Sequence, residues 1–342
     1  MENKTVIFGG LEGGASNSTL VLVSADGHVL AEVASELSTN HWMIGIDECF
    51  RRIAQMVTNA LKMASLPEET QLSAIGLCLS GCEDETVNKE MSDKFIQQYP
   101  SLADQCFVAS DTLGSLLTAA PDGGVVLIAG TGSNCLLFNG DQSSVKCGGW
   151  GHVLGDYGSA YWIANEAIRA VIESEENFRT IPFNVSAVRR AVFEHFQVVA
   201  ISQLLSPAYS HFDKRHFAAV CKSIAELAVK DNDPLAKDLF SRAGRVLAEH
   251  INGVLPKADP CLLSRSGGLP VVCVGSVFKS WSLLSKAFFE TISDKIPEIS
   301  FKRLVKSSAF GAALNAAKHS GHTIDFDFES NSQLLEHFSR RQ

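Results

Sequence analysis

The chain has 342 residues, a hydrophobic fraction of 46%, a charged fraction of 20% and a formal net charge of −9 at pH 7. This length exceeds what one hydrophobic core usually serves and favours two domains, and the composition excludes a disordered or fibrous chain. The acidic balance, without a basic stripe, argues against a nucleic-acid binder.

The first part of the chain predicts three strands and then alternating helices and strands. Residues 6–8 form a short apolar strand, and the strands over 20–23 and 28–33 flank Ala25-Asp26-Gly27, a hairpin signal because Asp-Gly tolerates positive φ. We expect these three strands to be antiparallel. The following elements are helices over 47–64 and 85–98, strands over 74–79 and 107–110, and a helix that starts near Asp111 and stops before Pro121.

The pattern restarts after Pro121. Residues 125–129 predict a buried strand that runs into Gly130-Thr131-Gly132-Ser133, and a return strand follows over 135–138. The later elements are a glycine-rich loop over 147–158, a helix over 159–173, a mostly helical stretch over 185–255, a strand over 269–274, a helix around Trp281, a last strand over 299–305 and an alanine-rich helix from about residue 308. The polar end of the chain could form a peripheral helix.

Alternating strands and helices indicate an α/β architecture with central sheets. Strand–turn–helix units occur twice, half a chain apart, which predicts a smaller lobe over residues 1–121 and a larger lobe over 122–342. The last helix could pack back on the smaller lobe. A short Pro-Asp-Gly-Gly turn at 121–124 joins the lobes and suits a hinge that closes over a ligand.

Nine cysteines are spread over the whole length, mostly inside apolar runs, which predicts buried reduced thiols. Cys78 and Cys82 have no second pair at zinc spacing, so a metal site there is disfavoured. The apolar run at the start is too short for a signal peptide, and no stretch is long enough to cross a bilayer. We therefore expect a soluble cytosolic protein.

Three apolar strands end in glycine followed by a small hydroxyl residue. Glycine lets the backbone approach a phosphate, and amide N–H groups in a tight turn form an anion-binding concavity. One such turn is weak evidence, whereas three favour phosphate binding over plain turns. They are Gly13-Gly14-Ala15-Ser16, Gly130-Thr131-Gly132-Ser133 and Gly275-Ser276.

Asp111 stands where a strand ends and a helix begins, which is where ligands lie in open α/β sheets. The residue could cap the helix or act as a general base toward a substrate hydroxyl. The glycine turns on both sides favour the base.

Two polar and aromatic loops are candidates for sugar binding. Trp150, among the glycines of 148–151, could stack on a sugar face, and Asp156 could accept hydrogen bonds from sugar hydroxyls. Alternatively this loop is simply packed, with Asp156 or Ser159 capping the next helix. Asn40 offers a donor and an acceptor to a hydroxyl or an acetamide, or it is a turn residue.

Several motifs resemble those of the eukaryotic-type N-acetylglucosamine kinases, a family of the actin-like ATPase superfamily. The likeness covers nearly the full chain. It implies a two-lobed ribonuclease-H-like fold shared with actin and hexokinase, ATP and sugar in the cleft between the lobes, and a homodimer. The motifs are Leu-Ser-Thr-Asn-His-Trp at 37–42, Pro-Asp-Gly-Gly-Val-Val-Leu-Ile at 121–128, Gly-Thr-Gly-Ser-Asn-Cys at 130–135, Cys-Gly-Gly-Trp-Gly-His at 147–152 and Cys-Val-Gly-Ser-Val at 273–277.

The resemblance also implies ATP-dependent phosphorylation of N-acetylglucosamine, with other N-acetyl amino sugars and muramyl peptides as further substrates. Asp111 would activate the sugar 6-hydroxyl, and we expect Glu12 to hold Mg²⁺ through water. The sugar pocket would comprise Asn40, Asp111, Gly149, Trp150, Gly151 and Asp156. The nucleotide site would comprise Gly13, Gly14, Ser16, Thr131, Ser133, Asn134, Ala218, Gly275, Ser276, Val277, Phe278 and Lys279.

Ser16 stands where the family usually has Thr and can keep the hydroxyl contact, and three further residues depart from the family pattern. Ala15 and Asn17 stand where the family usually has glycine and a basic residue, and Tyr157 stands where it usually has Glu. We expect these departures to affect ATP use more than the fold. Two rival functions stay open: a sugar or nucleotide sensor that has lost catalysis, and an iron–sulfur activator ATPase of the benzoyl-CoA reductase type.

Overall fold

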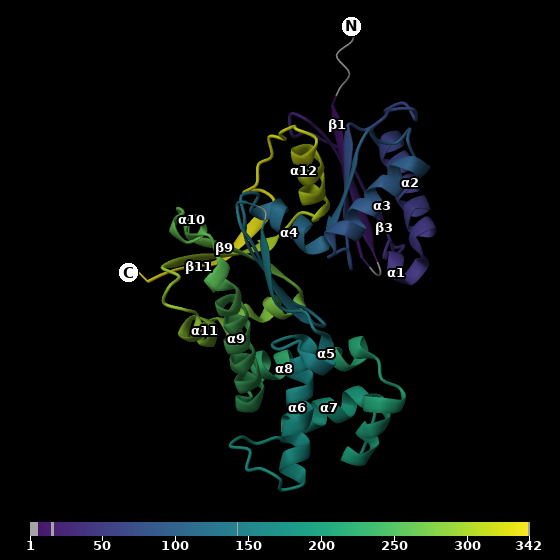
Figure 1. The fold of residues 1–342 in the computed structure, drawn as a ribbon. Helices are drawn as coiled ribbons and strands as arrows, with labels where there is room; N and C mark the ends of the chain where they lie inside the picture. Colours follow the sequence, from purple (N-terminus) through teal and green to yellow (C-terminus); the bar gives the residue numbers. More distant parts are fainter. Residues whose placement is uncertain (1–5, 15–16, 142, 341–342) are drawn as a thin grey trace. The chain divides into compact units, whose positions relative to one another are not determined.

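The computed structural model describes residues 6–14, 17–141 and 143–340. The chain forms two compact units (Figure 1). The first unit lies within Met1–Gly124 and Ser300–His337, and the second within Val125–Ile299 and Phe338–Gln342. The lobes expected over 1–121 and 122–342 remain a prediction.

The first unit contains a five-stranded sheet of order β3-β2-β1-β4-β5. Its strands are β1 (Ile7–Gly13), β2 (Ser18–Ser24), β3 (Val29–Ser35), β4 (Ala74–Leu79) and β5 (Cys106–Ser110). β1, β2 and β3 pair antiparallel, which confirms the predicted start of the sheet, whereas β1, β4 and β5 run parallel. The carboxyl ends of these three parallel strands therefore meet at one edge of the sheet.

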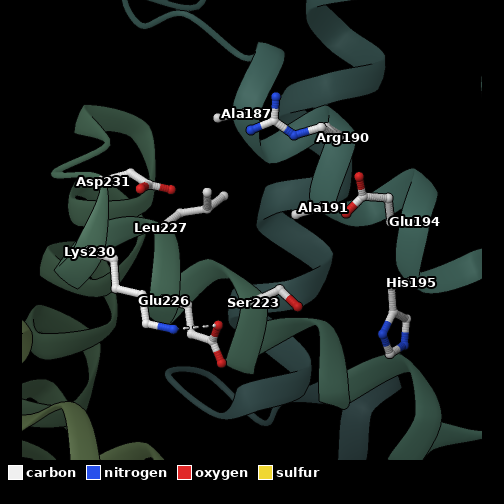
Figure 2. A pocket seen from close by; sticks show the side chains of 10 residues that line it. All are labelled: Ala187, Arg190, Ala191, Glu194, His195, Ser223, Glu226, Leu227, Lys230 and Asp231. Atoms are coloured by element: carbon white, nitrogen blue, oxygen red, sulfur yellow. Dashed lines mark hydrogen bonds and ion pairs between the residues drawn. The ribbon is translucent and has the colours of Figure 1, made fainter.

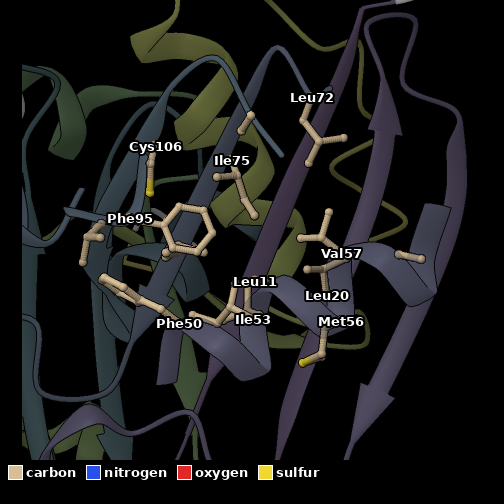
Figure 3. Packing of buried hydrophobic residues seen from close by; sticks show 14 of the residues in the cluster. Leu11, Leu20, Phe50, Ile53, Met56, Val57, Leu72, Ile75, Phe95 and Cys106 are labelled. Atoms are coloured by element: carbon tan, nitrogen blue, oxygen red, sulfur yellow. The ribbon is translucent and has the colours of Figure 1, made fainter. Parts of the chain in front are cut away.

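Helices cover both faces of this sheet. They are α1 (His41–Ile44), α2 (Ile46–Met63), α3 (Glu85–Gln98), α4 (Asp111–Ala119) and α12 (Ala309–His319). On one face, Phe50 and Ile53 of α2 and Phe95 of α3 pack on strand residues such as Leu11 and Ile75 in a fully buried cluster (Figure 3). Burial of apolar surface is the main force that holds such layers together.

The other face of the sheet carries α4 and α12, and α12 approaches the strands very closely. Gly10 of β1 and Gly76 of β4 are register partners. A Cβ at Gly10 would lie 2.1 Å from the Ala309 carbonyl oxygen, and one at Gly76 1.9 Å from that of Ala312. Because these two glycines lack a side chain, the backbone of the alanine-rich helix α12 can pack directly against β1 and β4.

The second sheet has the order β11-β10-β9-β6-β7-β8. β6 and β9 run parallel, and β7 and β8 run antiparallel. Its strands are β6 (Gly124–Ala129), β7 (Ser133–Phe138), β8 (Ser144–Gly148), β9 (Leu269–Val274), β10 (Glu298–Leu304) and β11 (Ser332–Ser339). The parallel strands β6 and β9 therefore end at one edge of this sheet.

The second unit is rich in helices, as the sequence predicted for residues 185–255. These elements are α5 (Gly151–Leu154), α6 (Ala160–Glu175), α7 (Ser186–Phe196), η1 (Ile201–Leu204), η2 (Ser206–Ser210), α8 (Lys214–Lys230), α9 (Pro234–Val254), η3 (Leu255–Lys257), α10 (Pro260–Ser264), η4 (Ser276–Ser280) and α11 (Trp281–Thr291). None of the helices in the described ranges has the length and apolar character that a membrane span requires.

The predicted α/β class is confirmed, one local prediction was wrong, and one strand was not predicted. The end of the chain forms the strand β11, not a helix, so the strand over 299–305 is not the last one. The segment before the glycine-rich loop also contributes a strand, β8. Both lie at the outside of the second sheet and carry few buried residues, so their own apolar pattern is weak and pairing with a neighbouring strand decides their conformation.

Candidate active site

The first unit holds Asp111 at the edge where β1, β4 and β5 end. Asp111 follows β5, begins α4 and is partly exposed. Its Oδ2 accepts a hydrogen bond from the Ser80 hydroxyl at 2.5 Å, and its Oδ1 lies 3.3 Å from the Thr112 hydroxyl. Ser80 follows β4 in the same way. The carboxylate thus lies at the sheet edge where open α/β proteins bind their ligands.

The cap of α4 is Ser110 and not Asp111. The Ser110 backbone is extended, and its hydroxyl accepts a hydrogen bond from the Leu113 N–H at 3.2 Å. Asp111 is the first residue of the helix, where the helix dipole favours a negative side chain. The capping role that the sequence left open for Asp111 is therefore taken by its neighbour.

Asn40 begins the short helix α1. Its Oδ1 accepts a hydrogen bond from the Trp42 N–H at 3.0 Å, so the side chain has the turn role that the sequence left open. The Trp42 Nε1 donates to the Gly81 carbonyl at 3.4 Å and anchors this loop beside the end of β4. The Nδ2 amide of Asn40 is the donor that the cap does not use.

Glu12 has a structural role that sequence reasoning missed. Its Oε2 accepts hydrogen bonds from the Ser307 hydroxyl at 2.6 Å and the Ser308 N–H at 3.1 Å, which ties β1 to the start of α12. The partners lie 295 and 296 positions away in the sequence, so no local signal could have revealed them.

The first glycine turn is only partly described. A Cβ at Gly13 would lie 2.2 Å from the Thr39 Oγ1, and the Gly14 N–H donates to the Asn17 carbonyl at 3.1 Å. Ser16, which the resemblance assigns to the nucleotide, lies outside the described residues, as does Ala15.

In the second unit, the turn over residues 130–133 connects β6 and β7. The Gly130 N–H donates to the Gly132 carbonyl at 2.9 Å, and the Ser133 N–H donates to Asp156 Oδ1 at 3.1 Å. Within the described part of the chain, this leaves the N–H groups of Thr131 and Gly132 as donors for an anion. Thr131 is also exposed, whereas Ser133 is buried and its hydroxyl donates to the Tyr157 carbonyl at 2.7 Å.

The end of β9 lies directly beside this turn. Gly275 has a φ of +113°, and a Cβ there would lie 2.4 Å from the Ala129 carbonyl oxygen and 2.7 Å from the Gly130 nitrogen. Val277 and Phe278, in η4, have buried side chains and can serve a ligand only through their backbone. Of the predicted stretch, Gly275, Ser276 and Lys279 are exposed.

Asp156 is an internal link of the second unit. Only 3% of the residue is exposed, its Oδ1 accepts the Ser133 N–H, and its Oδ2 lies 2.7 Å from the Lys214 ammonium. Lys214 is the first residue of α8, and Ala218 follows one turn later, 4% exposed. Ser159, not Asp156, caps α6 by accepting the Trp162 N–H at 3.1 Å.

The remaining loop residues present a bent glycine backbone and an exposed indole. Gly148, Gly149 and Gly151 all have positive φ, and Trp150 is 68% exposed with the Lys146 ammonium 5.5 Å from its ring centroid. The predicted nucleotide residue Asn134 lies beneath: a Cβ on Gly149 would be 2.9 Å from its Oδ1. The loop therefore offers the exposed aromatic face of Trp150 for stacking.

A separate groove of 450 Å³ lies between α7 and α8 (Figure 2). Its lining mixes Arg190, His195 and Lys230 with Glu194, Glu226 and Asp231, and Lys230 pairs with Glu226 at 3.2 Å. None of the predicted site residues lines this groove. Its opposite charges sit side by side and do not favour a ligand of one sign.

Most of the cysteines are buried thiols. Seven of the nine are buried, Cys147 is half-buried and Cys261 is exposed. Burial, and then the negative charges of Asp111 and Glu12, raises the pKa of the Cys78 thiol well above its usual range. In the described part of the chain, no three His, Cys, Asp or Glu side chains gather so that they could hold a metal ion.

Each unit thus presents backbone turns and small polar side chains where its parallel strands end, and the first adds a carboxylate. Two α/β units with central sheets are the fold of the actin-like ATPase class, which hexokinase-like sugar kinases share. The chain is a member of the BadF/BadG/BcrA/BcrD ATPase family, whose family model matches residues 10–316.

Two relatives cover nearly the full length. A Dictyostelium discoideum protein named N-acetyl-D-glucosamine kinase is 25% identical over 324 residues, which cover 91% of this chain and 97% of the relative. A Clostridium acetobutylicum protein named N-acetylmuramic acid/N-acetylglucosamine kinase is 24% identical and covers 90% and 97%.

Solved structures share the fold. A Chromobacterium violaceum protein provisionally named N-acetylglucosamine kinase has a TM-score of 0.66 at 23% identity, covering 91% of this chain and 99% of that one. A ROK hexokinase from Thermus thermophilus has a TM-score of 0.57 at 14% identity, with coverages of 92% and 99%. At these identities the structures establish the fold class alone.

Proposed function

We propose that this protein is an ATP-dependent kinase that phosphorylates the 6-hydroxyl of N-acetylglucosamine. The two relatives that span the chain are both named as kinases of N-acetyl sugars. The observation that carries the proposal is the Asp111 carboxylate, partly exposed at the end of β5 and not consumed as a helix cap. A carboxylate in that place suits the single proton transfer that sugar phosphorylation needs.

In the proposed reaction, the sugar 6-oxygen attacks the γ-phosphorus of ATP while its proton passes to Asp111. The bond from the γ-phosphorus to the β,γ-bridging oxygen breaks, and its electron pair leaves with ADP. Such a transfer depends mainly on positioning and on neutralising charge, so a few backbone amides and one carboxylate are enough protein chemistry.

The nucleotide is proposed to bind along the 130–133 turn and the end of β9. The Thr131 and Gly132 amides would meet the phosphates, and the exposed Gly275, Ser276 and Lys279 would border the adenosine. Mg²⁺ would neutralise phosphate charge. The residues present fit this ion, because Mg²⁺ keeps several waters and needs only one or two carboxylates beside the phosphates, and Glu12 has one oxygen outside its bonds to the start of α12.

The sugar is proposed to lie against Trp150 and the amide of Asn40, with Asp111 at its 6-hydroxyl. Trp150 is exposed enough to stack on an apolar sugar face. Asp156 is buried and bonded within its unit, so it would reach the sugar by exchanging one of these bonds or would act by shaping the 130–133 turn. The acetamide specificity rests on the hydrogen-bonding capacity of Asn40.

The test compares wild-type protein with Asp111→Asn in ADP release and in mass-spectrometric detection of the sugar phosphate. We expect turnover to fall at least about 100-fold, the usual contribution of a general base, with little change in sugar affinity. The matched control is Asp47→Asn, because Asp47 is an exposed aspartate of the same unit and pairs with Lys94 on the surface. Near-normal turnover of Asp111→Asn would remove it as the base.

A panel of N-acetylglucosamine, N-acetylmuramic acid, N-acetylmannosamine and glucose separates the kinase from its rivals. A sensor that has lost catalysis would bind sugar without sugar-dependent ADP release. An iron–sulfur activator needs reachable cysteine ligands, and burial of seven of nine thiols disfavours it. A purified protein that is brown and oxygen-sensitive would instead support the iron–sulfur activator function.

We also propose the homodimer that the resemblance implies. Light scattering should then give twice the chain mass of 36.9 kDa. A value at the single-chain mass over the whole concentration range would exclude the dimer without affecting the proposed chemistry.

A further inference from the structure

Ser80 and Asp111 occupy equivalent positions on neighbouring strands. β4 and β5 run parallel, and Leu79 is the register partner of Ser110. Each of the next residues, Ser80 and Asp111, is therefore the first one beyond its strand. The two side chains meet because the strands end together, a relation that their separation of 31 positions conceals in the sequence.

The Ser80 backbone is fixed on both sides. Its N–H donates to the Gly13 carbonyl at 2.9 Å and so joins the end of β4 to the end of β1. The chain then turns away at Gly81, whose φ is +88°, and whose carbonyl receives the Trp42 indole N–H. With its backbone held, the Ser80 hydroxyl reaches the carboxylate of Asp111 from a defined direction.

A serine hydroxyl has one hydrogen to donate, and here it goes to Oδ2 of Asp111 at 2.5 Å. The other oxygen, Oδ1, has only the long contact of 3.3 Å to the Thr112 hydroxyl. A carboxylate held through one oxygen cannot rotate freely about its terminal bond. The second oxygen then keeps one orientation in which it can accept a proton.

We propose that Ser80 is a positioning residue for the phosphoryl transfer, holding Oδ2 of Asp111 so that Oδ1 accepts the proton of the sugar 6-hydroxyl. This inference rests on the proposed function, because it assigns Asp111 as the base. Ser80 touches neither the sugar nor ATP in this role and acts through the carboxylate alone. Loss of the hydroxyl would leave Asp111 in place but misaligned.

The competing role of Ser80 is purely structural, and the backbone allows the two to be separated. The bond from the Ser80 N–H to Gly13 belongs to the main chain and survives replacement of the side chain. Ser80→Ala therefore keeps the ends of β4 and β1 together and removes only the hydroxyl. Ser80→Thr restores a hydroxyl on the same β-carbon.

The experiment measures kcat, KM for ATP, KM for N-acetylglucosamine and the thermal midpoint for Ser80→Ala, Ser80→Thr and Ser80→Cys. We expect Ser80→Ala to lower kcat about 10- to 100-fold, the scale of a misaligned catalytic group, with both KM values changed less than about twofold. Ser80→Thr should recover most of kcat, and Ser80→Cys, a weak donor of similar size, should lie between. The matched control is Ser92→Ala, which removes a partly exposed hydroxyl of the same unit that bonds to Asn88 and Val108 and should retain wild-type kcat.

A double mutant decides whether Ser80 acts through Asp111. Ser80→Ala in the Asp111→Asn background should cost no further turnover, because the carboxylate that it positions is already gone. Wild-type kcat in Ser80→Ala, or a full additive loss in the double mutant, would overturn the inference.

The two proposals fail separately. If Asp111→Asn keeps its turnover, the base assignment fails and Ser80 has nothing to position. If Asp111→Asn loses turnover while Ser80→Ala and Ser80→Cys do not, the kinase proposal stands and the role of Ser80 falls alone.

Discussion

Gly275 is the residue at which the end of β9 meets the end of β6. Its φ of +113° lies in the region that favours glycine, and any Cβ would collide with the carbonyl oxygen of Ala129 at 2.4 Å. Ala129 is followed directly by Gly130, the first residue of the predicted phosphate turn. A side chain at 275 would therefore displace the backbone that presents the turn.

We predict that Gly275→Ala weakens ATP binding at least tenfold and lowers the thermal midpoint. The control is Gly321→Ala, which has a comparable φ of +79° but nothing within 4 Å of the new methyl group. Gly321→Ala should lower the free energy of unfolding only by the cost of the positive φ, about 1–2 kcal/mol. Calorimetric ATP titration and thermal unfolding of both variants test this, and equal effects of the two substitutions would contradict it.

Glu12 anchors the start of α12, and its proposed contact with Mg²⁺ through water is a second role that experiment can separate from the first. Glu12→Gln keeps the shape but turns charge-assisted hydrogen bonds to Ser307 and Ser308 into neutral ones. We predict a loss of about 1 kcal/mol in urea unfolding without ligands. A raised Mg²⁺ requirement for turnover would add the metal role, whereas unchanged stability would remove the anchor.

At the scale of elements, α8 is tied to the 130–133 turn by a chain of three residues. The Lys214 ammonium at the start of α8 pairs with Asp156, which in turn accepts the N–H of Ser133. The position of α8, which carries Ala218, and the shape of the turn are therefore coupled through one buried carboxylate.

We predict that Lys214→Met raises the KM for ATP several-fold and costs about 2 kcal/mol of stability. This figure is below the roughly 3–5 kcal/mol of a fully buried pair because the Lys214 side chain is 32% exposed. Lys222→Met, an exposed lysine on the same helix, is the matched control. If Lys214→Met leaves the KM for ATP and the unfolding midpoint unchanged, the Lys214–Asp156 ion pair contributes neither to ATP binding nor to stability.

Elements with strong local patterns were predicted well. The strand over 74–79 and the helix over 85–98 have the bounds that the sequence predicted. A continuous apolar run and apolar residues spaced by four along a helix are both local signals. The strand β11 was missed, because its side chains are half-exposed and only pairing with a neighbour makes it a strand. Edge strands bury few side chains, so their sequences show little of the apolar alternation that predicts a strand.

At the scale of the whole molecule, the buried thiols make stability depend on alkaline pH. Burial raises the pKa of Cys49, Cys82 and Cys221 to about 12, from an ordinary value of 9.0. Between pH 9 and 12 the unfolded chain releases protons that the folded chain keeps. The free energy of unfolding must therefore fall as the pH rises through this window, and these thiols contribute no pH dependence well below pH 9.

We predict that the urea midpoint declines from pH 8 to pH 10, because the free energy of unfolding falls by up to about 1.4 kcal/mol per pH unit for each buried thiol above pH 9. Cys221→Ala should decline less steeply, which separates the thiols from other alkaline groups. In the native state a thiol reagent should modify Cys261 first, since it is the exposed cysteine. Rapid modification of many thiols in native protein would contradict the buried arrangement.

The sequence by itself determined the α/β class, the hairpin at Asp26-Gly27, the glycine turns and the candidacy of Asp111, because periodicity and turn chemistry are properties of neighbouring residues. Only the tertiary structure decided that Ser110 and not Asp111 caps α4, that Ser80 holds the carboxylate and that Glu12 anchors α12. The Ser110 cap is a local contact, and the structure decides it by fixing the residue at which α4 begins. The contacts of Ser80 and Glu12 join residues brought together by strand register and by the docking of α12, across separations of 31 to 296 positions. These distant partners are selected by packing, which no local stretch of sequence encodes.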